Sequence, residues 1–283
     1  MAKILAVTNQ KGGVGKTTTA VNLSACLAVL GQRVLMIDLD PQGNATTGCG
    51  VIKRVALPTV YQILIGRSTL AQARIHTEFG FDILPANREL AGAEVELIEI
   101  EGREYRLREA LALVQGDYDF ILMDCPPALN MLTVNGLVAA QAVMIPMQCE
   151  YYALEGLSQL IATINLVRNH LNPDLAIKGV VLTMYDPRTN LSAEVDAEVR
   201  KYLGPTVFDT IIPRSVRLSE APSYGLPIAL YRPDSKGAEA YAALAAELRA
   251  RDGRPIHPEL AGLAKDGASG HEAKPTAASG GEQ

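Results

Sequence analysis

Ten residues near the N-terminus combine glycines, lysines and threonines at a spacing that suits phosphate binding. Residues 9–18 read NQKGGVGKTT. In the pattern G-x-x-x-x-G-K-[ST], backbone N–H groups surround phosphate oxygens, the lysine reaches the β- and γ-phosphates, and the final hydroxyl coordinates Mg²⁺. Gln10 stands where that pattern has its first glycine. The segment still predicts a site for a nucleotide and magnesium, formed by Gln10, Lys11, Gly12, Gly13, Val14, Gly15, Lys16, Thr17 and Thr18.

Three carboxylates at the ends of apolar runs are placed to complete such a site. Asp38 ends the run RVLMID, Asp40 lies two residues later, and Asp124 ends the run DFILMD. In a parallel sheet, side chains at the carboxyl ends of strands face the crevice in which ligands bind. A single apolar strand that ends in aspartate would otherwise be only a strand terminus. In a chain that also has a phosphate loop, Asp124 is predicted to hold Mg²⁺ through water, beside Thr17.

The elements that would position these residues alternate along the chain. Continuous apolar runs, typical of strands covered on both faces, predict strands at 3–8, 33–38, 119–124, 142–146 and 177–183. Apolar residues at helical spacing predict helices at 20–30, 154–171, 191–203 and 241–251. This alternation predicts an α/β fold, a mostly parallel sheet with helices on both faces. Because no linker rich in Pro, Gly or Ser divides it, we expect a single domain at residues 1–251.

The composition limits the classes of protein that remain. Hydrophobic residues make up 48% of the chain and charged residues 20%, so a substantial core is available. The four cysteines form no C-x-x-C pair, which argues against a zinc or iron–sulfur site and against a disulfide framework. There is no signal-peptide pattern, and no apolar run reaches the roughly 18–20 residues that a membrane span requires. We therefore expect a soluble, cytoplasmic protein.

The composition changes at residues 252–283, where glycine and proline are frequent and large apolar side chains are few. Such a segment buries too little surface to offset the entropy lost on ordering, so we expect a disordered C-terminal tail. It would be either a solvated terminus or a tail that binds a partner.

Lys11 has no role in phosphate binding of this kind, and at this point the sequence resembles a known family. The string KGGVGKTT is similar to the deviant Walker A motif of the ParA/MinD class of ATPases. The resemblance implies that Lys11 reaches across a nucleotide-sandwich homodimer to the partner's phosphates. There it would neutralise charge on the transferring phosphoryl group, as an arginine finger does. Without the resemblance, Lys11 would be an ordinary surface charge.

Three further segments resemble the same class. VLMIDLDPQGNAT (34–46) is similar to switch I, and FILMDCPP (120–127) to a Walker B strand followed by switch II. The segment 210–241, TIIPRSVRLSEAPSYGLPIALYRPDSKGAEAY, resembles the C-terminal region of the chromosomal ParA/Soj branch. The resemblance implies that Asp40 orients the attacking water, that Asp38 contributes to the magnesium shell, and that Pro213 packs against adenine. It identifies the chain as a member of this P-loop ATPase class over about residues 3–250.

A net charge of −5 does not indicate a nucleic-acid binder, so DNA binding would need a local patch. Residues 200–232 contain five basic and two acidic side chains, an excess that a solvated face would also show. ParA proteins of the resembled kind bind double-stranded DNA without sequence preference as ATP dimers, which doubles the phosphate contacts. The resemblance implies Arg188, Arg214 and Arg217 as DNA contacts, although Arg214 could instead have a structural role. It also implies a ParB-type partner that stimulates slow ATP hydrolysis.

Several alternatives were weighed against this interpretation. A MinD-like membrane-cycling ATPase needs a terminal amphipathic helix with basic and bulky apolar residues, and EAKPTAASGGEQ (272–283) lacks that pattern. An iron–sulfur protein of the same superfamily would need a paired cysteine, which Cys125 does not have. A GTPase would carry the motif N-K-x-D, which does not appear in the sequence. The glycine spacing of the loop also does not fit the NAD-binding motif G-x-G-x-x-G. The sequence therefore predicts an ATP- and Mg²⁺-dependent dimerisation switch, associated with the nucleoid, that serves partitioning of a chromosome or plasmid.

Overall fold

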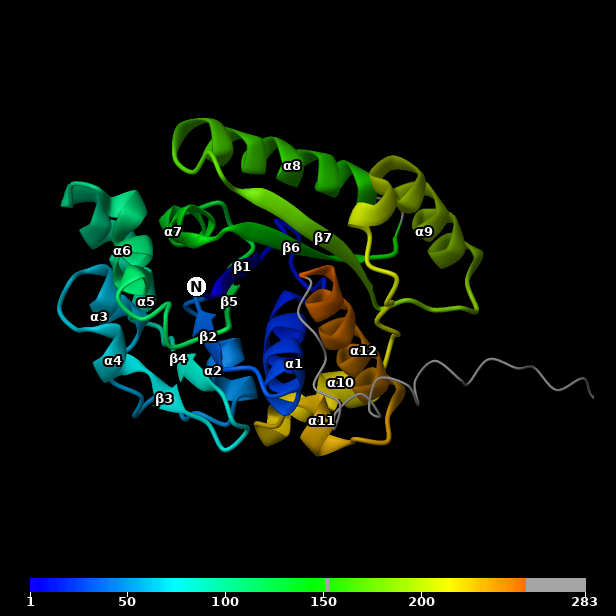
Figure 1. The fold of residues 1–283 in the computed structure, drawn as a ribbon, viewed down its shortest axis with the longest axis horizontal. Coiled ribbons are helices and arrows are strands. Elements are labelled where there is room, and N and C mark those ends of the chain that lie inside the picture. The colour runs from blue at the N-terminus through cyan, green and yellow to red at the C-terminus, as the bar shows by residue number, and fades with distance from the viewer. Residues whose placement is uncertain (151–152, 253–283) are drawn as a thin grey trace, which may run out of the picture.

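The computed structural model describes residues 1–150 and 153–252 (Figure 1). Helices and strands alternate along this part of the chain. The elements are β1 (Lys3–Val7), α1 (Lys16–Val29), β2 (Val34–Asp38), α2 (Asn44–Gly48), α3 (Val60–Leu64), α4 (Leu70–Ala73), β3 (Ile75–His76), β4 (Asp82–Leu84), α5 (Leu90–Glu96), η1 (Leu97–Glu99), η2 (Arg103–Tyr105), α6 (Arg106–Ala112), β5 (Phe120–Asp124), α7 (Met131–Ala139), β6 (Ala142–Gln148), α8 (Ala153–His170), β7 (Ala176–Thr183), α9 (Asn190–Leu203), η3 (Gly204–Thr206), α10 (Val216–Glu220), η4 (Ala221–Tyr224), α11 (Ile228–Tyr231) and α12 (Lys236–Arg251).

The strands form one sheet in the order β3-β4-β2-β5-β1-β6-β7. Every neighbouring pair is parallel except β3 and β4, which are antiparallel. The predicted α/β fold is confirmed, and the predicted strands correspond to β1, β2, β5, β6 and β7. The edge strands β3 and β4 were not predicted, because strands of two and three residues are too short to show a periodic pattern.

Helices cover both faces of the sheet, and this is why the central strands are apolar throughout. Successive β1 residues alternate between two cores: Ile4 belongs to one and Leu5 to the other. Figure 1 shows α8 above β6 and β7, and α1 and α12 below them. The sheet is thus buried on each side, as continuous apolar runs predict.

The helix predicted at 241–251 begins earlier, at Lys236. Its N-cap is Ser235, whose side chain accepts a hydrogen bond from the backbone N–H of Ala238, so the first turn has a capping donor–acceptor pair. Tyr241 lies in the core, and its hydroxyl is 3.1 Å from the Thr19 hydroxyl on α1. This contact locks α12 to the helix that follows the phosphate loop.

The end of α12 is packed into the domain. The Arg251 guanidinium lies 4.1 Å from the centre of the Phe208 ring and donates to the carbonyl oxygen of Val207 at 2.7 Å. Asp252 forms an ion pair with Lys178 on β7. The ordered body therefore reaches Asp252, and the remainder of the predicted tail, 253–283, lies outside the described residues.

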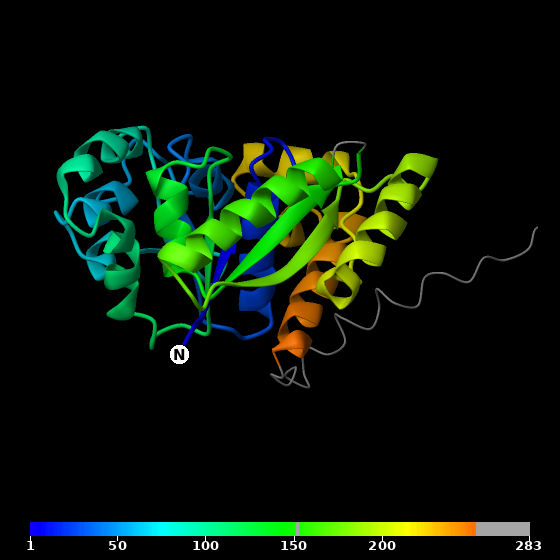
Figure 2. The ribbon, with the colours of Figure 1, turned by 90° about the horizontal axis from the view of Figure 1, so that it is seen from above.

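The register of the parallel strands brings the predicted site residues together at the carboxyl ends of β1, β2 and β5. Asp124 at the end of β5 is paired with Val7 at the end of β1 and with Asp38 at the end of β2. Figure 2 shows the amino-terminal end of β1 at the lower edge of the molecule and the loop after β1 at the upper edge. Parallel pairing of β1, β2 and β5 therefore gathers the loop and the aspartates at the same place.

Candidate functional site

The loop between β1 and α1 has the conformation of a phosphate cradle. Gly13 and Gly15 have φ angles of 76° and 85°, which residues with side chains rarely adopt. A Cβ atom added at Gly12 or Gly13 would meet nothing within 4 Å, so the space over the loop is open. The first turn of α1 contains no acidic residue and no side-chain cap. Its free N–H groups and the positive end of the helix dipole are therefore available to an anion.

Two buried side chains hold the loop against the neighbouring strands. The Asn9 side chain donates to the carbonyl of Pro146 in β6 at 2.8 Å, and its oxygen accepts from the Lys11 N–H at 3.0 Å. The Thr183 hydroxyl at the end of β7 donates to the carbonyl of Val14 at 2.9 Å. The loop is thus fixed by β6 and β7 before any ligand binds.

Lys16 extends across the inside of the loop. Its ammonium group donates to the carbonyl oxygen of Lys11 at 2.8 Å, and the residue is 7% exposed. Burial lowers its pKa, while the negative charge of Asp124 opposes that shift. A phosphate in the cradle would offer this ammonium a charged acceptor in place of a neutral carbonyl, which is a stronger hydrogen bond.

Thr17 and Asp124 form the oxygen pair expected of a magnesium site. The Thr17 hydroxyl donates to Oδ2 of Asp124 at 2.7 Å, across 107 positions of sequence. Oδ1 of Asp124 is buried and has no hydrogen-bond partner. Burial, followed by repulsion from Asp38, raises the Asp124 pKa well above its usual range. A buried carboxylate with an unused oxygen is suited to a divalent cation or its water.

The residues present fit magnesium better than a metal that needs a full protein cage. Among residues 1–150 and 153–252, no group of three or more His, Cys, Asp or Glu side chains could hold a metal ion. Mg²⁺ usually keeps several waters and binds one or two protein oxygens together with substrate phosphates. Thr17 and Asp124 supply such a partial set.

Asp38 is buried, and both of its oxygens already have protein donors. Oδ2 accepts from the backbone N–H and the hydroxyl of Thr46 at 2.8 and 2.7 Å, and Oδ1 accepts from the Asp40 N–H at 3.1 Å. Burial raises the pKa of Asp38 to about 6, against the effect of these hydrogen bonds. In this structure Asp38 shapes the segment after β2, and its contribution to a magnesium shell stays a prediction.

Asp40 is the less constrained of the two aspartates after β2. It is half-buried, and its Oδ1 accepts from the Gln42 N–H at 2.9 Å. Its backbone N–H donates to Asp38, which is paired with Asp124 across β2 and β5, so Asp40 follows the same end of the sheet. The Asp40 carboxylate can therefore accept a further hydrogen bond, for example from a water molecule. The role of Asp40 in orienting an attacking water stays a prediction.

Lys11 and Gln10 connect the rim of the loop to the β6–α8 region. The Lys11 ammonium forms an ion pair with Glu150, which follows β6. The Gln10 side chain donates to the Thr163 hydroxyl on α8 at 2.8 Å. Glutamine at the position of the motif's first glycine therefore has a structural use, because it tethers the loop to a helix on the other face of the sheet.

Pro213 lies at the same edge but apart from the cavity beside the loop. It is half-buried and bridges to Tyr185, two residues beyond Thr183. A cavity of about 280 Å³ opens next to the first turn of α1. Its lining residues are Thr17, Thr18, Val21, Asn22, Asn44, Thr47, Gly48, Ala221, Pro222 and Leu226. The contact of Pro213 with adenine stays a prediction.

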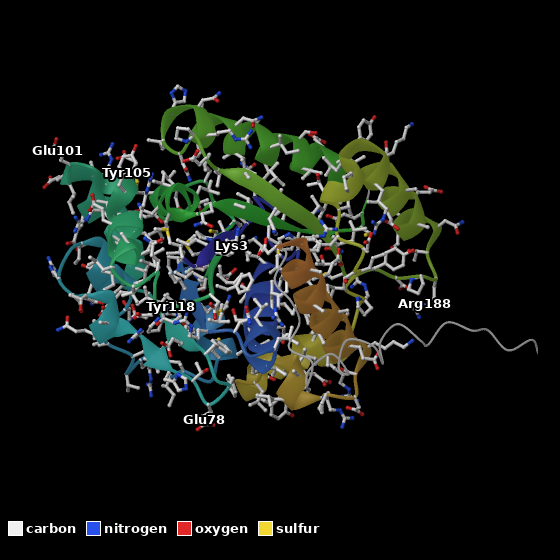
Figure 3. All side chains as sticks on the ribbon, in the orientation of Figure 1. Lys3, Glu78, Glu101, Tyr105, Tyr118 and Arg188 are labelled. Carbon is white, nitrogen blue, oxygen red and sulfur yellow. The ribbon has the colours of Figure 1, made fainter. Side chains whose placement is uncertain are left out.

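The predicted DNA contacts lie on the surface, and two of them have local acidic partners. Arg188, at the outer edge of the molecule beneath α9 in Figure 3, donates to both oxygens of Asp186, at 2.9 and 2.7 Å. That pairing lowers the Asp186 pKa to about 2. Arg217 on α10 donates to Glu220 at 2.8 Å. Arg214 is exposed, and its backbone N–H donates to the Tyr185 carbonyl.

Strand pairing brings Arg188 and Arg214 toward the same edge. Pro213, next to Arg214, bridges to Tyr185, three residues before Arg188. The hydrogen bonds from Arg188 are the main cause of the lowered Asp186 pKa, and the charge of Arg214 adds a smaller contribution in the same direction. DNA phosphates would have to compete with Asp186 and Glu220 for these guanidinium groups.

Several residues that shape the site were not predicted from the sequence. Thr46 orients Asp38, Thr183 holds the loop, and Glu150 pairs with Lys11. Each lies far along the chain from its partner or in a segment without a phosphate-binding pattern. Asn9 was within the quoted motif, and an Asn directly after a buried strand was the one available hint of an anchoring role.

Comparisons with known proteins give a consistent result. A family model described as an AAA domain matches residues 2–177. The sporulation initiation inhibitor protein Soj of Bacillus subtilis is 56% identical over 251 residues, which cover 88% of this chain and 99% of that protein. The chromosome partitioning protein ParA of Caulobacter vibrioides is 51% identical over 253 residues, covering 88% and 95%.

Solved structures share the fold over most of their length. A Mycobacterium smegmatis protein named cobyrinic acid a,c-diamide synthase, with bound ADP and magnesium, matches with a TM-score of 0.79 and 41% identity, covering 90% of this chain and 98% of that one. The septum site-determining protein MinD of Pyrococcus horikoshii, complexed with Mg-ADP, matches with a TM-score of 0.74 and 28% identity, covering 88% and 96%. Across the described residues, no helix is both long and apolar enough to cross a bilayer.

Proposed function

The chain belongs to the Soj/ParA family of chromosome-partitioning ATPases, and we propose that it is a switch whose dimerisation depends on Mg-ATP. In this proposal, the ATP dimer binds double-stranded DNA without sequence preference. Hydrolysis, stimulated by a ParB-type partner, then releases it from the nucleoid. The observation that carries the proposal is the different burial of the two loop lysines: Lys16 is buried inside the loop, and Lys11 is exposed at its rim.

ATP and Mg²⁺ are the ligands that the site supports. Similar structures hold ADP and magnesium, and the open cradle, Lys16 and the Thr17–Asp124 pair form a matching set of groups here. Lys16 would donate to a phosphate oxygen with the N–H groups that it does not use on the Lys11 carbonyl. Magnesium, held by Thr17 and Asp124, would neutralise charge on the β- and γ-phosphates.

Hydrolysis in this proposal depends on Asp40 and on Lys11 of a second subunit. Asp40 would orient the attacking water, because it follows β2 beside Asp38, which is paired with Asp124, and within the described residues its side chain accepts one hydrogen bond, from the Gln42 N–H. Carboxylates are weak bases, so Asp40 would act mainly by positioning the water, and turnover would be slow. Lys11 from the partner would stabilise charge on the transferring phosphoryl group.

DNA binding would follow from dimerisation because the basic surface of one subunit is small. Arg188, Arg214 and Arg217 provide few phosphate contacts in a monomer, and two of them are paired with carboxylates. Since the logarithm of DNA affinity rises with the number of phosphate contacts, doubling that number has a multiplicative effect. We favour this function over the synthase activity in the name of the 41% identical structure, because relatives at 51–56% identity are named for partitioning.

The test is a DNA mobility shift with ATP, ADP and no nucleotide, at two salt concentrations. We expect binding with ATP only, weaker at the higher salt. Vesicles of anionic lipid in place of DNA test the MinD-like alternative. DNA binding that is equal in all nucleotide states would reject the switch, and ATP-dependent vesicle binding without DNA binding would support the alternative.

Asp40→Ala separates hydrolysis from assembly. We expect ATP turnover to fall by about 100-fold or more, the usual contribution of a group that assists proton transfer, while the ATP dimer still forms and binds DNA. Single-turnover hydrolysis and light scattering measure the two properties. Asp234→Ala, on an exposed loop, is the matched control. Normal turnover in Asp40→Ala would remove Asp40 from the mechanism.

A further inference from the structure

Lys11 is held at three points in this structure. Its ammonium forms an ion pair with the Glu150 carboxylate. Its carbonyl oxygen accepts from the Lys16 ammonium at 2.8 Å, and its backbone N–H donates to the Asn9 side chain at 3.0 Å. A residue proposed to act on a partner's phosphates is therefore bound to its own subunit by side chain and backbone together.

Among the described residues, Glu150 lies between the end of β6 and the start of α8, and its own backbone contacts α8. Two residues before it, β6 ends at Gln148, paired with Thr183 on β7. The Glu150 carbonyl accepts from the Ala153 N–H at 3.0 Å as α8 begins. The tether from Gln10 to Thr163 holds the loop near the same helix. Glu150 is thus presented to Lys11 by β6 and α8 together.

The contact that matters for a partner is the one made by the Lys11 ammonium. Lys16 has three N–H donors, so it can serve a phosphate and still donate to the Lys11 carbonyl. The ion pair with Glu150, by contrast, occupies the ammonium group that would have to reach a partner's phosphates. An added Cβ at Gly12 or Gly13 would meet nothing within 4 Å, so the adjoining loop has room to move. Release of Lys11 toward a partner therefore requires the Glu150 pair to break.

The ion pair is weak enough to be broken by a better partner. The Lys11 and Glu150 side chains are 47% and 28% exposed, and exposed pairs usually contribute little to stability. A triphosphate offers several charged oxygens to an ammonium group, whereas Glu150 offers one carboxylate. ATP bound to a second subunit would therefore displace Glu150 from Lys11.

We propose that Glu150 is a positioning residue that keeps Lys11 on its own subunit until ATP and a second subunit are both present. This inference rests on the proposed ATP-dependent dimer. Glu150 opposes premature contact between two loops, and its removal favours assembly. The opposite sign would follow if Glu150 instead guided Lys11 toward the partner.

The first test compares Glu150→Gln, which removes the charge and keeps the shape, with Glu155→Gln, an exposed glutamate in the first turn of α8. The dimer dissociation constant with a nonhydrolysable ATP analogue is measured by sedimentation. Loss of one exposed ion pair changes an equilibrium constant by about two- to fivefold. Because each dimer releases two pairs, we expect Glu150→Gln to dimerise about 4- to 25-fold more tightly. Glu155→Gln should match wild type. Unchanged or weaker dimerisation of Glu150→Gln would overturn the proposal.

The second test examines the nucleotide-free monomer and so does not depend on the dimer. Amide hydrogen exchange in residues 11–15 should be faster in Glu150→Gln and in Lys11→Gln. The double variant should be no faster than either, because both changes break the same pair. A purely structural role for Glu150 would give additive effects and would reject the hold on Lys11. Failure of wild type to dimerise with ATP would reject the proposed function, whatever this exchange result shows.

Discussion

The nucleotide end of the sheet and the outer arginine surface both depend on charged side chains, but they are built differently. At the nucleotide end, Lys16, Asp38 and Asp124 are each less than a tenth exposed. Their partners are often distant in sequence, as Thr17 is from Asp124. At the arginine surface, Arg188 and Arg217 are exposed and pair with carboxylates two and three residues away. Water therefore competes with the ion pairs of the arginine surface, but with few contacts at the nucleotide end.

The difference predicts how each region responds to mutation. A buried charge that loses its partner is left desolvated and unpaired, which is costly. An exposed arginine that loses its carboxylate is simply hydrated, so the effect is small. Single changes at the nucleotide end should therefore act strongly, whereas changes at the arginine surface should be graded and depend on salt.

Lys16→Ala should have the largest effect on ligand binding. Removal of the buried ammonium takes away the charged donor for the β- and γ-phosphates, and we expect ATP affinity to fall by about 100-fold or more. Titration of a fluorescent ATP analogue measures this loss. Lys201→Ala, at an exposed site on α9, should bind ATP as wild type does. If Lys16→Ala retained ATP affinity, the assignment of the cradle would be wrong.

Asp124→Asn should change stability and activity in opposite directions. The amide keeps an acceptor for Thr17 and removes a buried charge whose Oδ1 has no partner. We expect the nucleotide-free protein to gain about 1–2 kcal/mol of unfolding free energy, or a few degrees in Tm. Magnesium-dependent ATP hydrolysis should be lost.

Differential scanning fluorimetry without nucleotide and a phosphate-release assay measure the two quantities for Asp124→Asn. Asp117→Asn, at an exposed aspartate paired with Arg74, is the control and should leave both unchanged. A less stable Asp124→Asn variant would mean that the carboxylate is compensated in the folded protein, which contradicts the contrast drawn between the two regions.

Arg217→Glu should weaken DNA binding by the ATP dimer and leave ATP-dependent dimerisation intact. One phosphate contact is lost in each subunit, and the new carboxylate lies near Glu220. The slope of log affinity against log salt should fall by about two, one unit for each lost contact. Arg67→Glu, at another exposed pair, controls for the change in net charge. An unchanged salt slope would exclude Arg217 from the DNA surface.

Asp186→Asn should have the smallest effect on DNA binding, and it should strengthen that binding, whereas Arg217→Glu weakens it. The change frees Arg188 from a two-point ion pair and removes a negative charge near Arg214. We expect DNA affinity to rise by about two- to fivefold, the scale of an exposed pair. Fluorescence anisotropy with labelled duplex DNA measures the gain. A loss of affinity would show that Asp186 orients Arg188 for phosphate and does not compete with it.

Much of the nucleotide end was predictable from local sequence. The α/β class, the central strands and membership of the ParA/Soj class were predicted and are confirmed. The roles of individual residues remain predictions, although the fold places Lys16, Thr17, Asp40 and Asp124 around one loop. The short helices and edge strands between residues 44 and 113 were not predicted. Segments of two to seven residues complete too few turns or alternations for periodicity to emerge.

Unbroken apolar runs sufficed to predict the central strands, which are confirmed, and the spacing of glycine and lysine predicts the phosphate loop. Both signals are local: a left-handed turn needs glycine where it occurs, and a strand buried on two faces needs apolar residues throughout. The pairing of Thr17 with Asp124, and of Lys11 with Glu150, was decided only when β1, β5 and β6 came into register. No local spacing encodes such contacts, because a side chain's partner across a sheet depends on which strands lie side by side.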